Sequence, residues 1–211
     1  MKVFADPITV NSRKVLAGLQ FLGVDYELQT VSYLTGEHTQ APYTTLNPNA
    51  SLPAIQDGDF VLWESNAILQ YAADKAGRSA QYPTDLQTRA DVNRWLLWES
   101  SAWFPSCYVY LAENCAKQLT GDAPDGAALA AEADRFAKLA GILNQRLGQS
   151  AWLCGDNPTI ADIAVAAPMH LHGWAKLPLD ANHNLVRWMT QSVEQLPAWQ
   201  ATHVPDGLGL G

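Results

Sequence analysis

Two short runs in the first third of the chain carry residues that could hold a small peptide. Leu52-Pro53 comes just before an expected strand. A proline cannot donate to a sheet ladder, so Pro53 belongs at the first position of that strand or in a special turn. If the peptide bond before Pro53 is cis, the backbone N–H and C=O of Leu52 can pair with an extended ligand. An ordinary strand-start proline explains the same residues.

The second run is Glu64-Ser65, which opens an expected helix. Ser65 suits an N-cap or first-turn position, where unpaired backbone N–H groups favour a bound anion. A ligand carboxylate would fit there, with Glu64 beside a ligand ammonium group. Taken alone, this pair is explained by simple helix capping.

The elements that must position these runs alternate between strands and helices. Short runs of β-forming residues indicate strands, and apolar residues at helical spacing indicate helices. Gly58-Asp59, between two such strand runs, is a hairpin signal. We therefore expect strands at 2–5, 26–31, 54–57 and 60–62, helices at 12–23 and 64–75, and a short helical or irregular piece at 42–46. The order βαβ(α)ββα predicts a small mixed sheet with helices against it.

The rest of the chain has almost no strand signal. Helical periodicity covers 87–117, 127–147, 160–171 and 184–196. The predicted fold class is an α/β domain followed by an all-α domain. The expected boundaries are 1–76 for the first domain, 77–86 for a linker that contains Gly77 and Pro83, and 87–211 for the helical domain.

Charge and cysteine content narrow the class of protein. The net charge of -8 argues against a nucleic-acid partner, which would need a basic face. No run approaches the length of a membrane span, and the N-terminal residues lack the apolar core of a signal peptide. Cys107, Cys115 and Cys154 are an odd, widely spaced set, which suits neither a disulfide framework nor a zinc site. We expect a cytoplasmic protein that binds neither nucleic acid nor membrane.

Taken together, the two peptide-binding runs resemble the cytosolic glutathione S-transferases. The matching segments are 36–38 (Gly-Glu-His), 46–54 (Leu-Asn-Pro-Asn-Ala-Ser-Leu-Pro-Ala) and 62–68 (Leu-Trp-Glu-Ser-Asn-Ala-Ile). In the helical part, 155–163 resembles the helix-start signature of this family, with Thr159 and Asp162 as a capping pair. By this resemblance the chain is identified as a member of that family, of bacterial type and either nu-like or delta/phi-like. The resemblance implies a thioredoxin-like first domain.

The resemblance also assigns the glutathione contacts. Leu52 should pair with the cysteinyl backbone, Glu64 and Ser65 should hold the γ-glutamyl group, and His38 matches a position that reaches the glycine carboxylate. The full predicted glutathione-binding set is His38, Ser51, Leu52, Pro53, Glu64, Ser65 and Asn66.

Glutathione chemistry needs a thiolate, which a hydrogen-bond donor near a helix N-terminus can stabilise. The loop at 6–15 contains no tyrosine or cysteine, which argues for the Thr/Ser-type classes. Thr9 matches the serine of delta- and phi-like members and is the first choice. Asn11 is a close second, because the Thr-x-Asn spacing resembles the nu class. Ser12 is read instead as the N-cap of the first helix.

The second substrate is expected against the long helix from 87. The predicted electrophile-site residues are Trp103, Phe104, Cys107, Tyr108 and Leu111, although such a stripe is equally typical of a core. Pro105 should bend this helix. The family is typically homodimeric, with 95–98 as a candidate interface. His170 and His172 point to different sides of a helix, so no metal is assigned.

The predicted function is a detoxifying glutathione transferase that activates the thiol for attack on a small hydrophobic electrophile. Glutathione is then a co-substrate, and no cofactor is expected. Two alternatives stay open. One is glutathione-dependent reduction of a disulfide or peroxide, as in nu-like proteins. The other is a protein that binds glutathione on the same fold without catalysis.

Overall fold

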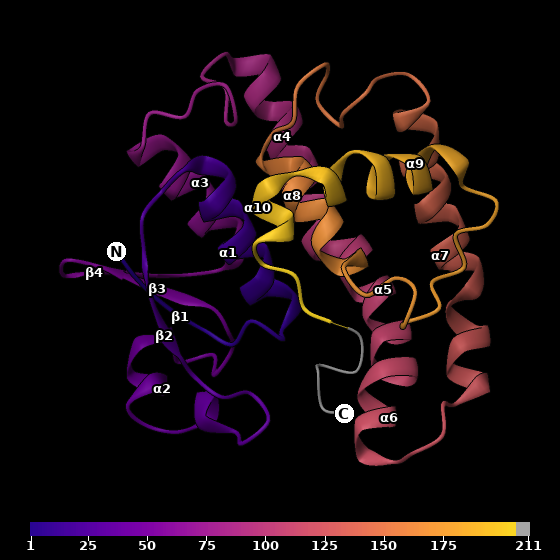
Figure 1. Ribbon diagram of the computed structural model, residues 1–211, viewed down its shortest axis with the longest axis horizontal. Coiled ribbons are helices and arrows are strands. Elements are labelled where there is room, and N and C mark those ends of the chain that lie inside the picture. The colour runs from indigo at the N-terminus through magenta and orange to yellow at the C-terminus, as the bar shows by residue number, and fades with distance from the viewer. Residues whose placement is uncertain (206–211) are drawn as a thin grey trace. The chain divides into compact units, whose positions relative to one another are not determined.

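The computed structural model describes residues 1–205 and divides into two compact units (Figure 1). Unit 1 comprises Met1–Pro83 together with Leu196–His203, and unit 2 is built on Thr84–Gln195. The division after Pro83 falls inside the expected linker at 77–86. The return of Leu196–His203 to unit 1 was not expected from the sequence, which assigned all residues after 86 to the helical domain.

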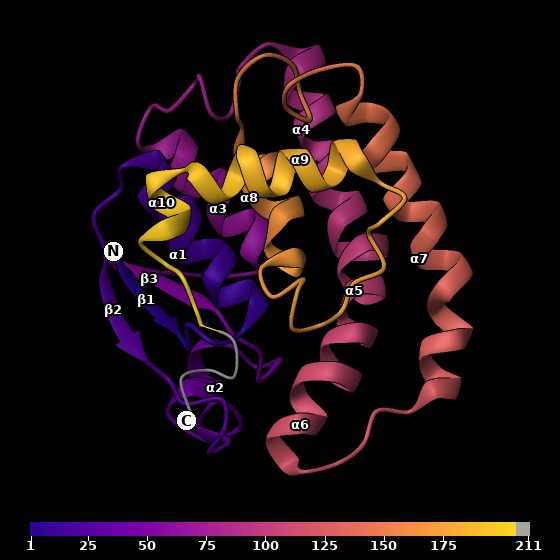
Figure 2. The ribbon, with the colours of Figure 1, turned by 45° about the vertical axis from the view of Figure 1, so that its right-hand side comes forward.

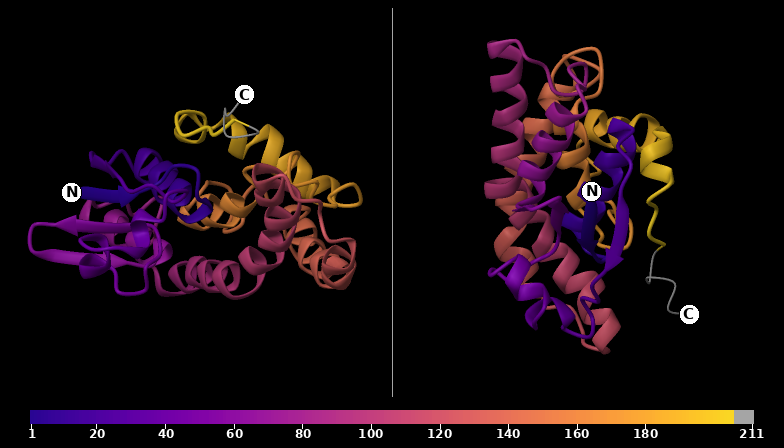
Figure 3. Two further views of the ribbon diagram at one scale, coloured as in Figure 1. Left: turned by 90° about the horizontal axis from the view of Figure 1, so that it is seen from below. Right: turned by 90° about the vertical axis from the view of Figure 1, so that its left-hand side faces the viewer.

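Unit 1 contains a mixed four-stranded sheet. Its strands are β1 (Lys2–Ala5), β2 (Glu27–Thr30), β3 (Ala54–Asp57) and β4 (Phe60–Trp63), in the order β2-β1-β3-β4. β1 and β2 are parallel, whereas β3 is antiparallel to both β1 and β4. Gly58-Asp59 joins β3 to β4, and Gly58 has a φ of 63°, a value that glycine adopts at little cost. The predicted hairpin is confirmed, and Figure 3 shows it extending from the sheet.

The helices of unit 1 are α1 (Val10–Leu22), α2 (Tyr43–Leu46), α3 (Ser65–Lys75) and α10 (Pro197–Gln200), with a 3-10 turn at Glu37–Thr39. α1 packs against both α3 and α10. Gly18 permits the approach of α1 to α3, because a Cβ there would lie 2.2 Å from Cδ2 of Leu69. A cation–π contact also holds α10 against α1. The Arg13 guanidinium carbon lies 4.0 Å from the centroid of the Trp199 ring.

A small apolar cluster covers one face of the sheet beside α2. Phe4 and Ala54 are direct cross-strand neighbours, so their side chains share a face, and they pack with Val31, Tyr43 and Leu52. Burial raises the pKa of the Tyr43 phenol to about 12, so this hydroxyl stays protonated. The cluster therefore anchors the segment that leads into β3.

Unit 2 begins with one helical path made of several segments (Figure 2). These are α4 (Leu86–Trp98), a π segment at Glu99–Trp103, α5 (Phe104–Leu111), a second π segment at Ala112–Ala116 and α6 (Lys117–Thr120). Pro105 lacks a backbone N–H and crowds the carbonyl of residue 101, which accounts for the first π segment. The prediction of a single helix over 87–117 gives the right path but misses these irregular turns.

The later helices of unit 2 are α7 (Gly126–Leu147), α8 (Ile160–Ala166) and α9 (His183–Gln191). α8 and α9 are shorter than predicted, because Pro168 lies in a 3-10 turn that ends α8 and a second 3-10 turn follows α9. Thr159 and Asp162 form the predicted capping box at the start of α8. The Asp162 carboxylate also accepts from the N–H of Leu153 at 2.9 Å, so this motif is structural.

Candidate functional site

The Leu52–Pro53 peptide bond is cis, as the first of the two sequence interpretations required. The Leu52 side chain is buried in the cluster beside α2, while its N–H and C=O make no hydrogen bond within residues 1–205. The preceding carbonyl, that of Ser51, is fixed by Tyr43 Oη at 2.5 Å and by Asn47 Nδ2 at 2.7 Å. The chain therefore presents one backbone donor and one acceptor from a rigidly held turn.

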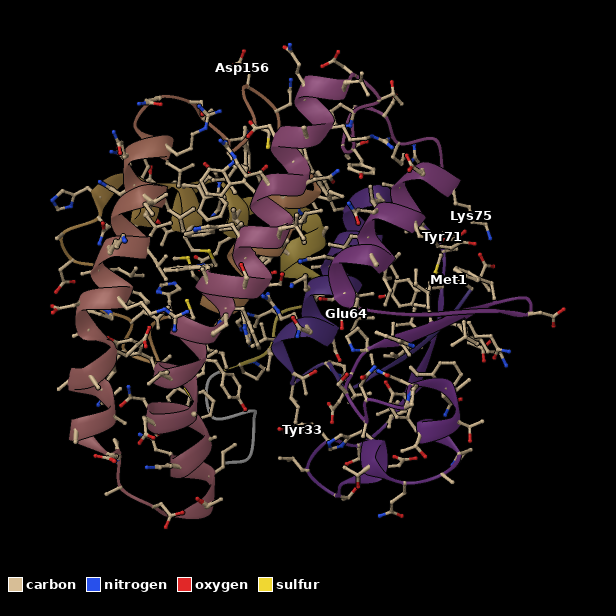
Figure 4. All side chains as sticks on the ribbon, turned by 180° about the vertical axis from the view of Figure 1, so that it is seen from behind. Met1, Tyr33, Glu64, Tyr71, Lys75 and Asp156 are labelled. Atoms are coloured by element: carbon tan, nitrogen blue, oxygen red, sulfur yellow. The ribbon has the colours of Figure 1, made fainter. Side chains whose placement is uncertain are left out.

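The start of α3 provides the second part of the site. Ser65 is the first residue of α3 and is buried, so it is a first-turn residue and not the cap. Glu64 occupies the N-cap position of α3 and is labelled in Figure 4. Its side chain makes no capping hydrogen bond, and its φ is 75°. A positive φ is unfavourable for a residue with a Cβ, and such strain is often found at ligand sites. Glu64 is exposed, and it immediately precedes the first backbone N–H groups of α3, which have no partner within the helix.

A hydrogen-bond network joins α1 to the start of α3. Lys14 of α1 donates to Ser65 Oγ at 3.2 Å and to Asn66 Oδ1 at 3.3 Å. The Ser65 hydroxyl in turn donates to Asn11 Oδ1 at 3.4 Å. The structure thus brings together Asn11, Ser65 and Asn66 from the predicted set. Lys14 was missed, because a lysine in a helix reads as an exposed residue.

The loop between β1 and α1 holds Thr9 as the N-cap residue of α1. Its hydroxyl lies 2.7 Å from Ser12 Oγ and 3.1 Å from the carbonyl oxygen of Asp6, and its one hydrogen can be donated to either atom. The prediction that Ser12 caps the helix is wrong. Helix α1 begins earlier, at Val10, and Ser12 is a buried first-turn residue whose Oγ accepts the Asp6 N–H at 3.3 Å.

The Asn11 and Thr9 side chains differ in the hydrogen-bond donors that they can offer to a ligand. It is half-buried, its Oδ1 accepts from Ser65, and its Nδ2 makes no hydrogen bond among the described residues 1–205. An amide nitrogen carries two N–H donors. Asn11 therefore has donors available for a ligand, whereas the Thr9 hydroxyl hydrogen is committed within its own loop.

His38 lies in the loop that follows β2. Its ring stacks on Tyr33 at a centroid distance of 4.8 Å, and its Nδ1 is buried without a hydrogen-bond partner in the described part of the chain. Asp6 ties this loop to the start of α1, because its carboxylate accepts from the N–H groups of Tyr33 at 2.8 Å and Ile8 at 3.2 Å. No sequence signal marked this role of Asp6.

The predicted electrophile-site residues separate into two groups within unit 2. Trp103 and Cys107 are completely buried, and the Trp103 indole stacks on Trp98 and donates to the carbonyl of Val165 at 3.0 Å. These two residues are core residues, so their assignment to a ligand-facing wall is wrong. Residues four apart share a helix face, and here that face packs inward.

The remaining three residues of that set lie differently. The centroids of the Phe104 and Tyr108 rings lie 5.6 Å apart. Tyr108 is 46% exposed, whereas Leu111 is buried. Burial raises the pKa of the Cys107 thiol well above its ordinary value, so this thiol is not a nucleophile at neutral pH. A ligand role for Phe104, Tyr108 and Leu111 stays a prediction.

Metal binding and membrane spanning are two further properties of the described residues. Within residues 1–205, no group of three His, Cys, Asp or Glu side chains could hold a metal ion. His172 instead lies 3.1 Å from Glu194, and His170 contacts the carbonyl of Ala167. Over the same residues, no helix is both long and apolar enough to cross a bilayer.

Two known protein domains match this chain. Residues 1–74 match the family described as "Glutathione S-transferase, N-terminal domain", and residues 126–201 match "Glutathione S-transferase, C-terminal domain". The chain is 30% identical to a glutathione S-transferase of Hyoscyamus muticus, over 94% of this chain and 95% of the relative. It is 34% identical to glutathione S-transferase 3 of Zea mays, over 77% of this chain and 73% of the relative.

Solved structures give the same result. Glutathione S-transferase III in its apo form is 30% identical, with a TM-score of 0.83 over 95% of this chain and 94% of the other. Maize glutathione S-transferase I in complex with an atrazine glutathione conjugate shares the fold, with a TM-score of 0.86, 24% identity and coverage of 96% and 95%. The chain belongs to the glutathione S-transferase family.

Proposed function

We propose that this protein is a glutathione transferase that binds glutathione on unit 1 and activates its thiol for attack on a small hydrophobic electrophile. The observation that carries the proposal is the unpaired Leu52 backbone before a cis proline, in the same unit as the strained Glu64-Ser65 start of α3. The Leu52 N–H and C=O would pair with the cysteinyl backbone of the tripeptide, as one rung of a sheet. Glu64 would hold the γ-glutamyl ammonium, and the backbone N–H of Ser65, the first residue of α3, would donate to the γ-glutamyl carboxylate.

The other predicted contacts follow from the same placement. His38 would reach the glycine carboxylate, and its stacking on Tyr33 restricts the orientation of the ring. Ser51 and Asn66 would flank the tripeptide at its two ends. Glutathione is a co-substrate in this proposal, and no cofactor or metal takes part.

For thiol activation we favour Asn11 over Thr9. The Asn11 amide has N–H donors that no described residue occupies, while the Thr9 hydroxyl donates to Ser12 or Asp6. A hydrogen bond from Asn11 to the sulfur, together with the N-terminal end of α1, would favour the thiolate form. Thr9 would then order the loop and act as a secondary donor when its hydroxyl rotates.

The test compares the native protein with Asn11→Ala and Thr9→Ala. A chloronitrobenzene acceptor measures conjugation, and a disulfide substrate measures glutathione-dependent reduction. We expect Asn11→Ala to lower kcat for the preferred reaction by about 100-fold, the usual contribution of one oriented donor, and Thr9→Ala to lower it by about tenfold. If the native protein binds glutathione tightly and performs neither reaction, the enzyme proposal fails.

The reductase alternative has one specific feature in its favour, the Thr9-x-Asn11 spacing that resembles the nu class. In that case the disulfide assay would give the larger kcat/KM. The non-catalytic alternative makes a different prediction. The ultraviolet thiolate band of bound glutathione would be absent near neutral pH, because no donor would have lowered the thiol pKa.

We also propose that the protein is a cytoplasmic homodimer of the Thr/Ser-type classes. On unit 2, a hollow of about 320 Å³ is lined by Arg94, Trp95, Trp98, Ile142, Gln145, Arg146 and Gln149, and includes the predicted interface region at 95–98. Leu97 is 70% exposed, a cost that a partner subunit would remove. Sedimentation analysis of the native protein and Leu97→Glu should give a dimer and a weakened dimer, respectively.

A further inference from the structure

Lys14 is a cation buried inside unit 1. Its side chain is on α1 and only 1% exposed, and its Nζ donates to Ser65 Oγ and Asn66 Oδ1 at the start of α3. Removing an ammonium group from water costs free energy, which hydrogen bonds to the group return in part. Helix packing by itself would be better served by an apolar side chain of the same length.

The direction of the hydrogen bonds follows from the chemistry of the three groups. A protonated lysine can only donate, so Ser65 Oγ must accept from Lys14. The hydroxyl hydrogen of Ser65 is then directed to Asn11 Oδ1, 3.4 Å away. An amide oxygen can only accept, so this contact fixes the Asn11 amide with Oδ1 toward Ser65 and Nδ2 away from it. Lys14 thereby determines which end of Asn11 can face a ligand.

We propose that Lys14 is a positioning residue for thiol activation. It acts through Ser65 on Asn11, and it keeps the amide N–H groups of Asn11 directed to the sulfur. It also places a positive charge beneath the site for the γ-glutamyl carboxylate. This inference rests on the proposed function, because it requires that Asn11 donates to the glutathione thiolate.

The neighbouring charged groups do not take over this role. The Arg13 guanidinium is directed to the other end of unit 1, where it donates to the carbonyls of Trp199 at 3.2 Å and Thr202 at 2.8 Å. The Asp6 carboxylate accepts from two backbone N–H groups, and the Glu64 side chain is exposed. Lys14 donates to two residues at the start of α3, Ser65 and Asn66.

The test replaces Lys14 with Met, Gln and Arg. Met keeps the length and packing, Gln keeps a donor without charge, and Arg keeps the charge. A pH titration of the thiolate band of bound glutathione is the main readout. We expect Lys14→Met and Lys14→Gln to raise the thiol pKa by about one unit and lower kcat about tenfold, as loss of a nearby opposite charge and an oriented donor requires. Lys14→Arg should keep the thiol pKa within about 0.5 unit of the native value and kcat within about threefold of it.

The matched control is Lys75→Met, which removes one positive charge from α3 in the same unit. Lys75 pairs with Asp57, away from Ser65, so the thiol pKa should not change. A second readout needs no glutathione. The side-chain amide signals of Asn11 in nuclear magnetic resonance spectra should shift in Lys14→Met, which removes the donor to Ser65, and stay in place in Lys75→Met.

The outcomes separate the two proposals. If folded Lys14→Met and Lys14→Gln titrate like the native protein and the Asn11 amide signals do not move, Lys14 does not position Asn11. If Lys14→Met does not fold, Lys14→Gln and Lys14→Arg alone decide between charge and packing. If the amide signals shift but the native protein forms no thiolate with glutathione, the network exists and the proposed function is wrong.

Discussion

The backbone N–H of Tyr33 donates to the Asp6 carboxylate at 2.8 Å, although the two residues are 27 positions apart in the chain. This bond joins the loop before α1, which carries Thr9, to the loop that carries His38. In the proposed complex the first loop would contact the cysteinyl sulfur and the second would contact the glycine carboxylate. Their separation therefore depends on one carboxylate that does not itself need to touch the ligand.

Asp6→Ala should separate these loops. The N–H groups of Tyr33 and Ile8 would lose their acceptor, and two charge-assisted hydrogen bonds would be lost. We expect the free energy of unfolding to fall by about 2–3 kcal/mol and glutathione affinity to fall about tenfold. Urea unfolding and isothermal titration calorimetry measure the two effects. Asp59→Ala, in the exposed hairpin turn, is the control and should change neither quantity.

Glu64 should be strained by its backbone conformation. At a φ of 75°, Glu64→Gly removes the cost of the Cβ, whereas Glu64→Ala keeps it. Both variants lose the carboxylate, so their difference isolates the backbone. We expect the Gly variant to be more stable than the Ala variant by about 1 kcal/mol in urea unfolding. Equal stabilities would show that the positive φ carries no strain.

The contact between α1 and α3 should tolerate no added carbon at Gly18. A Cβ there would lie 2.2 Å from Leu69 Cδ2, so Gly18→Ala should lower the free energy of unfolding by about 1–3 kcal/mol. The matched change is Gly141→Ala, inside α7, where a Cβ would meet nothing within 4 Å. That variant should gain about 0.5–1 kcal/mol, because alanine restricts the unfolded chain. Thermal or urea unfolding of the pair would detect the opposite signs.

Asp162 should make stability depend on pH. Burial raises its pKa from 3.8 to about 6 in the folded protein. Between these two values the folded state holds a proton that the unfolded state has released. The free energy of unfolding therefore falls as pH rises from about 4 to 6, by up to about 1.4 kcal/mol per pH unit from this residue. The stabilising contribution is complete below pH 4 and is lost above pH 6.

Asp162→Asn removes the titrating group and checks this expectation. The variant should be less stable overall, because Leu153 and Thr159 donate to different oxygens of Asp162 and asparagine replaces one of these acceptors with an NH2 donor. Its unfolding free energy should nevertheless vary less between pH 4 and 6 than that of the native protein. Identical slopes for the two proteins would mean that Asp162 is ionised throughout this range.

Local features of the fold could be predicted from the sequence. The hairpin at Gly58-Asp59, the capping box of Thr159 and Asp162, and the division near 77–86 depend on residues close together in the chain, whose turn and capping preferences act locally. The family resemblance then indicated where a tripeptide would lie, around Pro53 and Ser65.

The burial of individual side chains, and the hydrogen-bond donors that they can offer to a ligand, could be seen only in the tertiary structure. Trp103 and Cys107 have the spacing of a ligand-facing stripe, yet their helix face packs into the core of unit 2. Lys14 and Asn11 are three residues apart on α1, but their relation runs through Ser65 of α3, more than 50 positions away. Local preferences cannot specify such a contact, because it exists only after α1 and α3 have packed together.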